Sequence, residues 1–282
     1  MRESTGELRE WIIPSAFLIC AGWVIWHMPA FILDLYPPDN QSLVEILRQL
    51  HERKDVSPGL PGLFGGYADA IDWLAMVLIP VLFVWGSLTV RIAHNEFKHW
   101  RQIDRPTLFI SRITMILIIA MSCIMLYEVF LRYVFEAPTL WANEMTQWLA
   151  CFVFLFSGLY AMQQRCHIRI FLLYDMLSRR TQRILDVIAV IIVCIPAFFL
   201  VYGSYIQVFV NKFYKWEMYG TAFDPPLPAT VLPAILIVIT LIALQSVINI
   251  FSDWNEVKVL HSAAEQVDQE EIDALKRNVG VQ

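Results

Sequence analysis

The fold is decided by residues 127–183, which read YEVFLRYVFEAPTLWANEMTQWLACFVFLFSGLYAMQQRCHIRIFLLYDMLSRRTQR. An apolar segment ends at Glu128 and Arg132, a proline breaks the chain, and a second uncharged run follows. The stretch closes with a basic segment that begins at His167 and Arg169. This pattern predicts a membrane hairpin with polar side chains at its two ends. Charged groups are costly next to lipid, so these ends are where we expect function.

The composition excludes a soluble globular protein. Hydrophobic residues make up 57% of the 282 residues and charged residues only 17%, against about a quarter charged in soluble domains. The apolar residues are gathered into long uncharged runs. We therefore predict an all-α, polytopic integral membrane protein.

A hydrocarbon core about 30 Å thick is crossed by about 20 helical residues. Six segments of the sequence approach or exceed this length with their charges absent or near the ends. The six predicted transmembrane helices cover residues 12–33, 73–90, 106–131, 145–164, 187–211 and 225–252.

The placement of Lys and Arg predicts the orientation. With the N-terminus inside, 15 of the 21 Lys and Arg residues fall on the cytoplasmic side, as the positive-inside rule requires. The first residues are too acidic for a signal-peptide n-region, so we expect the first apolar run to remain as a helix. The prediction is six helices with both termini cytoplasmic.

The sequence contains no catalytic constellation. Serine-hydrolase, zinc-protease and phosphate-loop motifs are missing, and the five cysteines are too far apart for a CxxC zinc site. The apolar-run histidine His27 lies near the opposite interface from His94 and His99, which argues against a bis-histidine haem. We expect no catalytic residue, no metal and no cofactor, and the lack of a basic tract indicates no nucleic-acid partner.

The centres of the predicted helices are also nearly bare of charge. Ion and proton pathways normally place acidic or basic residues at mid-helix, and the broken helix pairs of transporter sites are not obvious. A membrane chain without a site of its own is expected to work as part of a complex.

The outer end of the hairpin carries a predicted ion pair. Glu128 and Arg132 stand four residues apart in the order that favours a helical pair, and pairing lowers the cost of both charges at a low-dielectric margin. Thr139 is the predicted N-cap of the helix that follows. A capped hairpin without further function remains the alternative.

Two further groups of polar residues flank this hairpin. Trp141, Glu144 and Trp148 fall on one face of the second helix, near its outer end. His167 and Arg169 border an apolar run on the inner side, as in a connector lying in the headgroup layer. Simple orientation by positive charge is the alternative for the inner group.

Four short motifs in this order resemble a known family. They are R-Y-V-F from Arg132 through Tyr133 to residue 135, P-T-x-W-x-x-E at 138–144, G-x-x-Y-A at 158–161, and H-[IV]-R at 167–169. Together they resemble the small membrane subunit of tripartite ATP-independent periplasmic (TRAP) transporters, the DctQ-like subunits. The resemblance covers roughly residues 108–252. It departs at Phe171, where such subunits usually carry an aspartate.

The resemblance implies a non-catalytic scaffold in a bacterial inner membrane. In such transporters a periplasmic solute-binding protein captures an organic acid or related solute. A large permease subunit then moves the solute with a sodium gradient, and the small subunit packs against the permease. Seven residues are implied as contacts with that subunit or with membrane lipid: Glu128, Arg132, Tyr133, Trp141, Glu144, His167 and Arg169.

The resemblance also divides the chain. Residues 1–105 form an N-terminal extension with two predicted transmembrane helices and an outer loop, in which Leu43, Ile46, Leu47 and Leu50 make an amphipathic stripe. Residues 106–252 are the four-helix TRAP small-subunit domain, and 253–282 an acidic cytoplasmic tail. Two alternatives stay open, a membrane anchor of a quinone-linked oxidoreductase and a stand-alone carrier.

Overall fold

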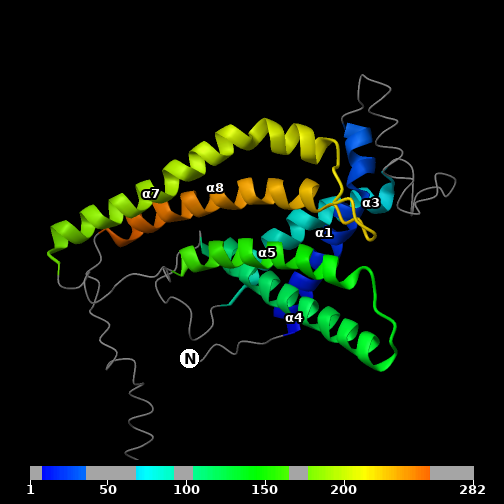
Figure 1. Ribbon diagram of the computed structural model, residues 1–282. Helices are drawn as coiled ribbons and strands as arrows, with labels where there is room; N and C mark the ends of the chain where they lie inside the picture. The colour runs from blue at the N-terminus through cyan, green and yellow to red at the C-terminus, as the bar shows by residue number, and fades with distance from the viewer. Residues whose placement is uncertain (1–7, 36–67, 92–103, 165–176, 255–282) are drawn as a thin grey trace, which may run out of the picture.

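The computed structural model describes residues 8–35, 68–91, 104–164 and 177–254 (Figure 1). This part of the chain is helical and contains no strand. Its helices are α1 (Leu8–Leu35), α3 (Ala70–Thr89), α4 (Arg105–Val134), α5 (Ala142–Gln163), α7 (Arg179–Tyr205), the π-helix η2 (Ile206–Tyr214) and α8 (Leu227–Asp253).

Six described helical segments are long and apolar enough to cross a membrane, with α7 and η2 forming one segment. Each contains or closely overlaps a span predicted from the sequence, so the all-α polytopic fold is confirmed. Both termini inside the cell stays a prediction. The amphipathic stripe of the outer loop and almost all of the acidic tail lie outside the described residues.

The longest segment, Arg179–Tyr214, differs most from its predicted bounds. Ser178 begins it, with a side-chain oxygen that accepts from the Thr181 N–H at 3.4 Å. Its 36 residues span about 54 Å at 1.5 Å per residue, well beyond a hydrocarbon core of about 30 Å. Figure 1 shows it as an arch over α8. Only 6% of its most apolar window is buried, so its outward face suits lipid tails or a partner helix.

The described helices pack as two groups that contact each other, one of α4, α5, α7 and α8 and one of α1 and α3. α4 and α5 form an antiparallel hairpin, α5 packs on α8, and α8 packs on α7. α1 pairs with α3, and both contact α4. A buried cluster joins the two groups through residues of α1, α3 and α4: Ile13, Leu82, Phe109, Ile113 and Leu117. The two N-terminal helices are therefore part of one helical body with the hairpin.

The α3–α4 contact depends on a glycine. A Cβ atom added at Gly86 would lie 2.1 Å from the ring of Phe109, and Phe109 itself is 1% exposed. Helices in membranes approach closely where one of them carries a small residue. Gly86 therefore makes the space into which the Phe109 ring packs.

We predict that Gly86→Ala weakens the packing of α3 on α4. The added methyl group overfills the contact, which costs about 1–3 kcal/mol. Gly22→Ala in α1 is the matched control, since nothing lies within 4 Å of a Cβ there. Thermal unfolding in mild detergent measures the melting temperature of each purified variant. Equal melting temperatures for the two variants would contradict the close contact.

Candidate functional site

The Glu128 carboxylate is a buried charge near the end of α4, with 2% of the residue exposed. Arg132 donates to its Oε1 from Nη2 at 2.6 Å and from Nε at 3.2 Å. Thr139 donates to Oε2 through its backbone N–H at 3.0 Å and also through its hydroxyl. The predicted ion pair is confirmed. Both carboxylate oxygens therefore accept hydrogen bonds from this same chain, which ties Glu128 to the turn after α4.

The C-terminal end of α4 is capped by backbone hydrogen bonds. The N–H groups of Phe135 and Ala137 both donate to the Leu131 carbonyl at 3.1 Å. Between them Glu136 has a φ of 52°, in the left-handed region that reverses the chain direction. This turn sends the chain back toward Glu128 and brings Thr139 within reach of its carboxylate.

The start of α5 differs from the prediction. The helix begins at Ala142, so the cap position falls on Trp141, which makes no side-chain cap hydrogen bond. The prediction of Thr139 as the N-cap is therefore wrong. The Thr139 hydroxyl oxygen does, however, accept a hydrogen bond from the Ala142 N–H at 3.3 Å. The same hydroxyl donates to Glu128. Thr139 thus links the end of α4 to the start of α5.

The other two predicted contact residues of α4 lie on the surface of the described part. The Arg132 side chain is 44% exposed and Tyr133 is 77% exposed. Their exposure leaves both side chains accessible to a neighbouring chain or to lipid. The predicted inner pair, His167 and Arg169, lies outside the described residues.

Three residues at the start of α5 contact the segment 221–230, which leads into α8. The pairs are Trp141 with Phe223, Glu144 with Thr221, and Trp148 with Thr230. The two ring centroids of the first pair lie 6.5 Å apart. The hydrogen bonds of the other two pairs measure 2.5 and 2.8 Å. The three residues share one face, as the spacing predicts, and that face meets the turn before α8 and the first turn of α8.

The turn between η2 and α8 extends this contact to α1. Trp216 is 1% exposed and packs with Ile32 of α1 and Ala229 of α8. Nearby, the Lys212 ammonium pairs with the Glu217 carboxylate at 2.5 Å. The C-terminal end of α1 therefore packs against this turn and the start of α8.

A second polar network lies at the other end of the helices. Gln245 of α8 donates to the Asp104 carboxylate before α4 and to the Asn249 side chain, each at 3.0 Å. Asn249 in turn donates to the Met162 carbonyl of α5 at 2.7 Å. Side-chain hydrogen bonds between helices contribute to their association in membranes, alongside close packing. This network joins α4, α5 and α8 where the predicted inner side lies.

The sequence prediction missed a buried carboxylate in α3. Asp72 is 1% exposed, and its Oδ1 accepts from the Trp23 indole at 2.8 Å and lies 3.8 Å from His27 Nδ1. Asp69 and Asp72 cap α3 reciprocally. The signal was present as two aspartates three residues apart before an apolar run, the spacing of a capping box.

Across the described residues, no group of three or more His, Cys, Asp or Glu side chains could hold a metal ion. Buried Asp72 and Gln245 and half-buried Trp148 instead join separate segments of the chain, and buried Glu128 joins α4 to the turn that follows it. Fold and site together define a multi-pass helical membrane protein whose described polar groups link its helices and turns.

Residues 121–255 match the family model of the tripartite ATP-independent periplasmic transporters, DctQ component. The resemblance predicted from the sequence is confirmed, since the matched family is the one that the four motifs indicated. The match begins within α4 and takes in α5, α7, η2 and α8. No curated protein and no solved structure matches the chain.

We predict that Trp148→Phe loosens the packing of α5 on α8. The variant loses the indole donor to Thr230, a hydrogen bond between helices worth roughly 1 kcal/mol. Trp85→Phe is the control, because Trp85 is 54% exposed. Thermal unfolding followed by circular dichroism measures the difference. A Trp85→Phe variant that loses as much stability as Trp148→Phe would contradict this role.

Proposed function

We propose that the chain is the non-catalytic small permease subunit of a sodium-coupled TRAP-type secondary transporter in a bacterial inner membrane. The observation that carries the proposal is the DctQ match over residues 121–255. The large permease subunit would move an organic acid or related solute that a periplasmic binding protein delivers. The present chain would supply the fixed membrane scaffold beside it.

The buried polar groups support a scaffold more than a transport path. Both carboxylate oxygens of Glu128 accept hydrogen bonds, one from Arg132 and the other from Thr139. Asp72 accepts a hydrogen bond from the Trp23 indole. A carboxylate that carries a coupling ion must exchange partners during transport. These carboxylates serve as fixed links between segments of one chain.

We infer that Arg132 and Tyr133 belong to the contact surface for the large subunit. Arginine has five N–H donors, and only Nη2 and Nε of Arg132 donate to Glu128. The remaining donors lie on a side chain that is 44% exposed. Trp141 and Glu144, in contrast, face Phe223 and Thr221 of the same chain, so they would act by shaping this surface.

The helices α1 and α3 widen the scaffold in this proposal. We assign them to an extension, residues 1–105, beside a four-helix unit, residues 106–252, because they lie outside the DctQ match. Both helices contact α4. The extension would enlarge the fixed membrane body against which the large subunit moves.

Co-expression with a candidate large subunit tests the proposal. We expect the two chains to co-purify in mild detergent and, with a binding protein, to support solute uptake that requires a sodium gradient. Uptake by this chain alone in proteoliposomes would contradict the scaffold function, and so would a failure of the two chains to co-purify.

Within that system we predict that Arg132→Ala lowers the yield of the complex severalfold while the free chain stays folded. The variant removes an exposed donor and the charge that balances Glu128. Lys215→Ala is the control, because Lys215 is an exposed cation in the turn after η2. The yield of complex relative to free chain is read by size-exclusion chromatography. Equal yields for the two variants would remove Arg132 from the contact surface.

A further inference from the structure

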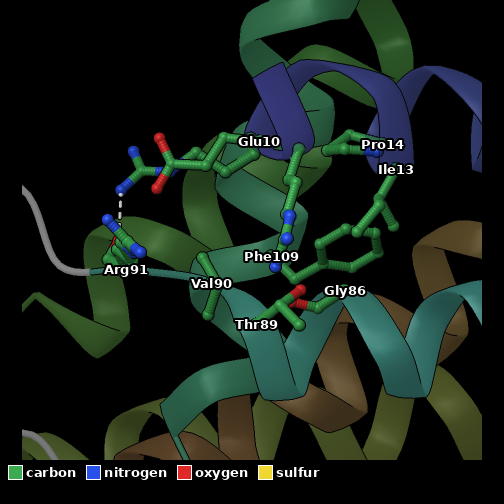
Figure 2. Close-up of a pocket in the computed structure, with 10 residues that line it drawn as sticks. Glu10, Ile13, Pro14, Gly86, Thr89, Val90, Arg91 and Phe109 are labelled. Carbon is green, nitrogen blue, oxygen red and sulfur yellow. Dashed lines mark hydrogen bonds between the residues drawn. The ribbon is translucent and has the colours of Figure 1, made fainter. Parts of the chain in front are cut away.

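A pocket of about 200 Å³ opens where α1 starts, α3 ends and α4 starts (Figure 2). That volume is several times the roughly 30 Å³ that one water molecule takes up. It lies at the opposite end of α4 from the Glu128–Arg132 pair, so neither the outer contact surface nor the α5–α8 packing explains it.

The pocket is positively charged. Its lining includes three arginines and one carboxylate, Arg9, Arg91, Arg112 and Glu10, so these side chains sum to a charge of +2. Arg112 Nη2 donates to the Arg91 carbonyl at 3.0 Å, which holds this guanidinium beside the C-terminal end of α3. The arrangement attracts an anion and gives it a planar donor group.

The deeper wall of the pocket is apolar. Ile13 and Pro14 of α1 and Phe109 of α4 line it, and Ile13 and Phe109 are buried. In Figure 2, Glu10 and Arg91 lie on one side of the pocket, while Ile13 and Phe109 lie on the other. The ligand that fits both sides carries an anionic group joined to an apolar one.

The depth of the pocket in the membrane follows from the ends of the three spans. The span of α1 starts at Leu8, that of α3 ends at Thr89 and that of α4 starts at Arg105. Arg9 and Arg91 therefore lie where hydrocarbon gives way to headgroups, and Ile13 and Phe109 lie about one helical turn deeper. Trp11, which is 46% exposed, has the interfacial position that indole rings prefer. The argument holds whichever side of the membrane this end faces.

We propose that this pocket binds the phosphate of an anionic phospholipid, with the start of its acyl chains against Ile13 and Phe109. Basic pockets between transmembrane helices are a recognised way to hold such headgroups. The net charge of +2 favours an anionic lipid over a zwitterionic one. The apolar wall favours a lipid over a free phosphate ion. The site joins α1, α3 and α4, so an occupied pocket stabilises the N-terminal helices on the hairpin. The proposal does not depend on the transporter function.

Lipid binding to the full-length chain in mild detergent tests the proposal by native mass spectrometry. The probes are dioleoyl-phosphatidylglycerol and dioleoyl-phosphatidylcholine, which share their acyl chains and differ in net charge. We expect tighter binding of the phosphatidylglycerol. Thermal unfolding with added inorganic phosphate forms a second arm, and we expect no stabilisation comparable to that given by the anionic lipid.

The variant Arg9→Gln with Arg91→Gln removes two positive charges from the pocket. Each positive charge contributes about 1 kcal/mol to the binding free energy of an anionic headgroup. We therefore expect the variant to bind phosphatidylglycerol roughly thirtyfold more weakly. Arg9→Lys with Arg91→Lys keeps the charges and should retain most of the affinity. The control, Lys212→Gln with Lys215→Gln, removes two charges at the opposite end of the described helices and should bind as the original chain does.

Three results would overturn the proposal. These are equal binding of the two lipids, stabilisation by inorganic phosphate that matches the lipid, and unchanged phosphatidylglycerol binding in the glutamine variant. Should that variant not fold, the comparison of the two lipids on the original chain and on the lysine variant still decides the question.

Discussion

A carboxylate buried at the margin of a membrane must be paired, and the α4–α5 hairpin is arranged around one. Glu128 has its charge balanced by Arg132 and its second oxygen bound by Thr139. The first partner lies on the same helix, but the second lies beyond the turn. Satisfying the charge therefore fixes how the chain leaves α4 and enters α5. That entry sets the face of α5 that meets the segment 221–230, and so positions α8.

The N-terminal helices are joined to the rest of the described molecule at both ends by different means. At one end Trp216 packs against Ile32 of α1. At the other, Phe109 of α4 packs into the space that Gly86 leaves on α3, beside the basic pocket. The buried Asp72 carboxylate links α3 to α1 through the Trp23 indole. Packing of small and aromatic residues, with few polar bonds, is how helices associate where water is absent.

The sequence was sufficient for features that depend on neighbours along the chain. The six spans followed from the absence of charge, and the Glu128–Arg132 pair followed from helical spacing. Contacts between segments that lie far apart in the sequence could not be predicted from it. Spacing placed Trp148 on the same face as Glu144, but which helix that face would meet depends on the packing of the whole molecule. Asp72 was left just outside the predicted helix at 73–90, and its burial depends on Trp23, which lies 49 residues earlier in the chain.

The central claim is that Glu128 and Thr139 act as one unit in holding α4 to α5. A double-mutant cycle with Glu128→Gln, Thr139→Val and the combined variant measures it most directly, by thermal unfolding in mild detergent. The account predicts that the combined variant loses clearly less stability than the two single losses added together. Additive losses would show that the two residues act independently and would contradict the account.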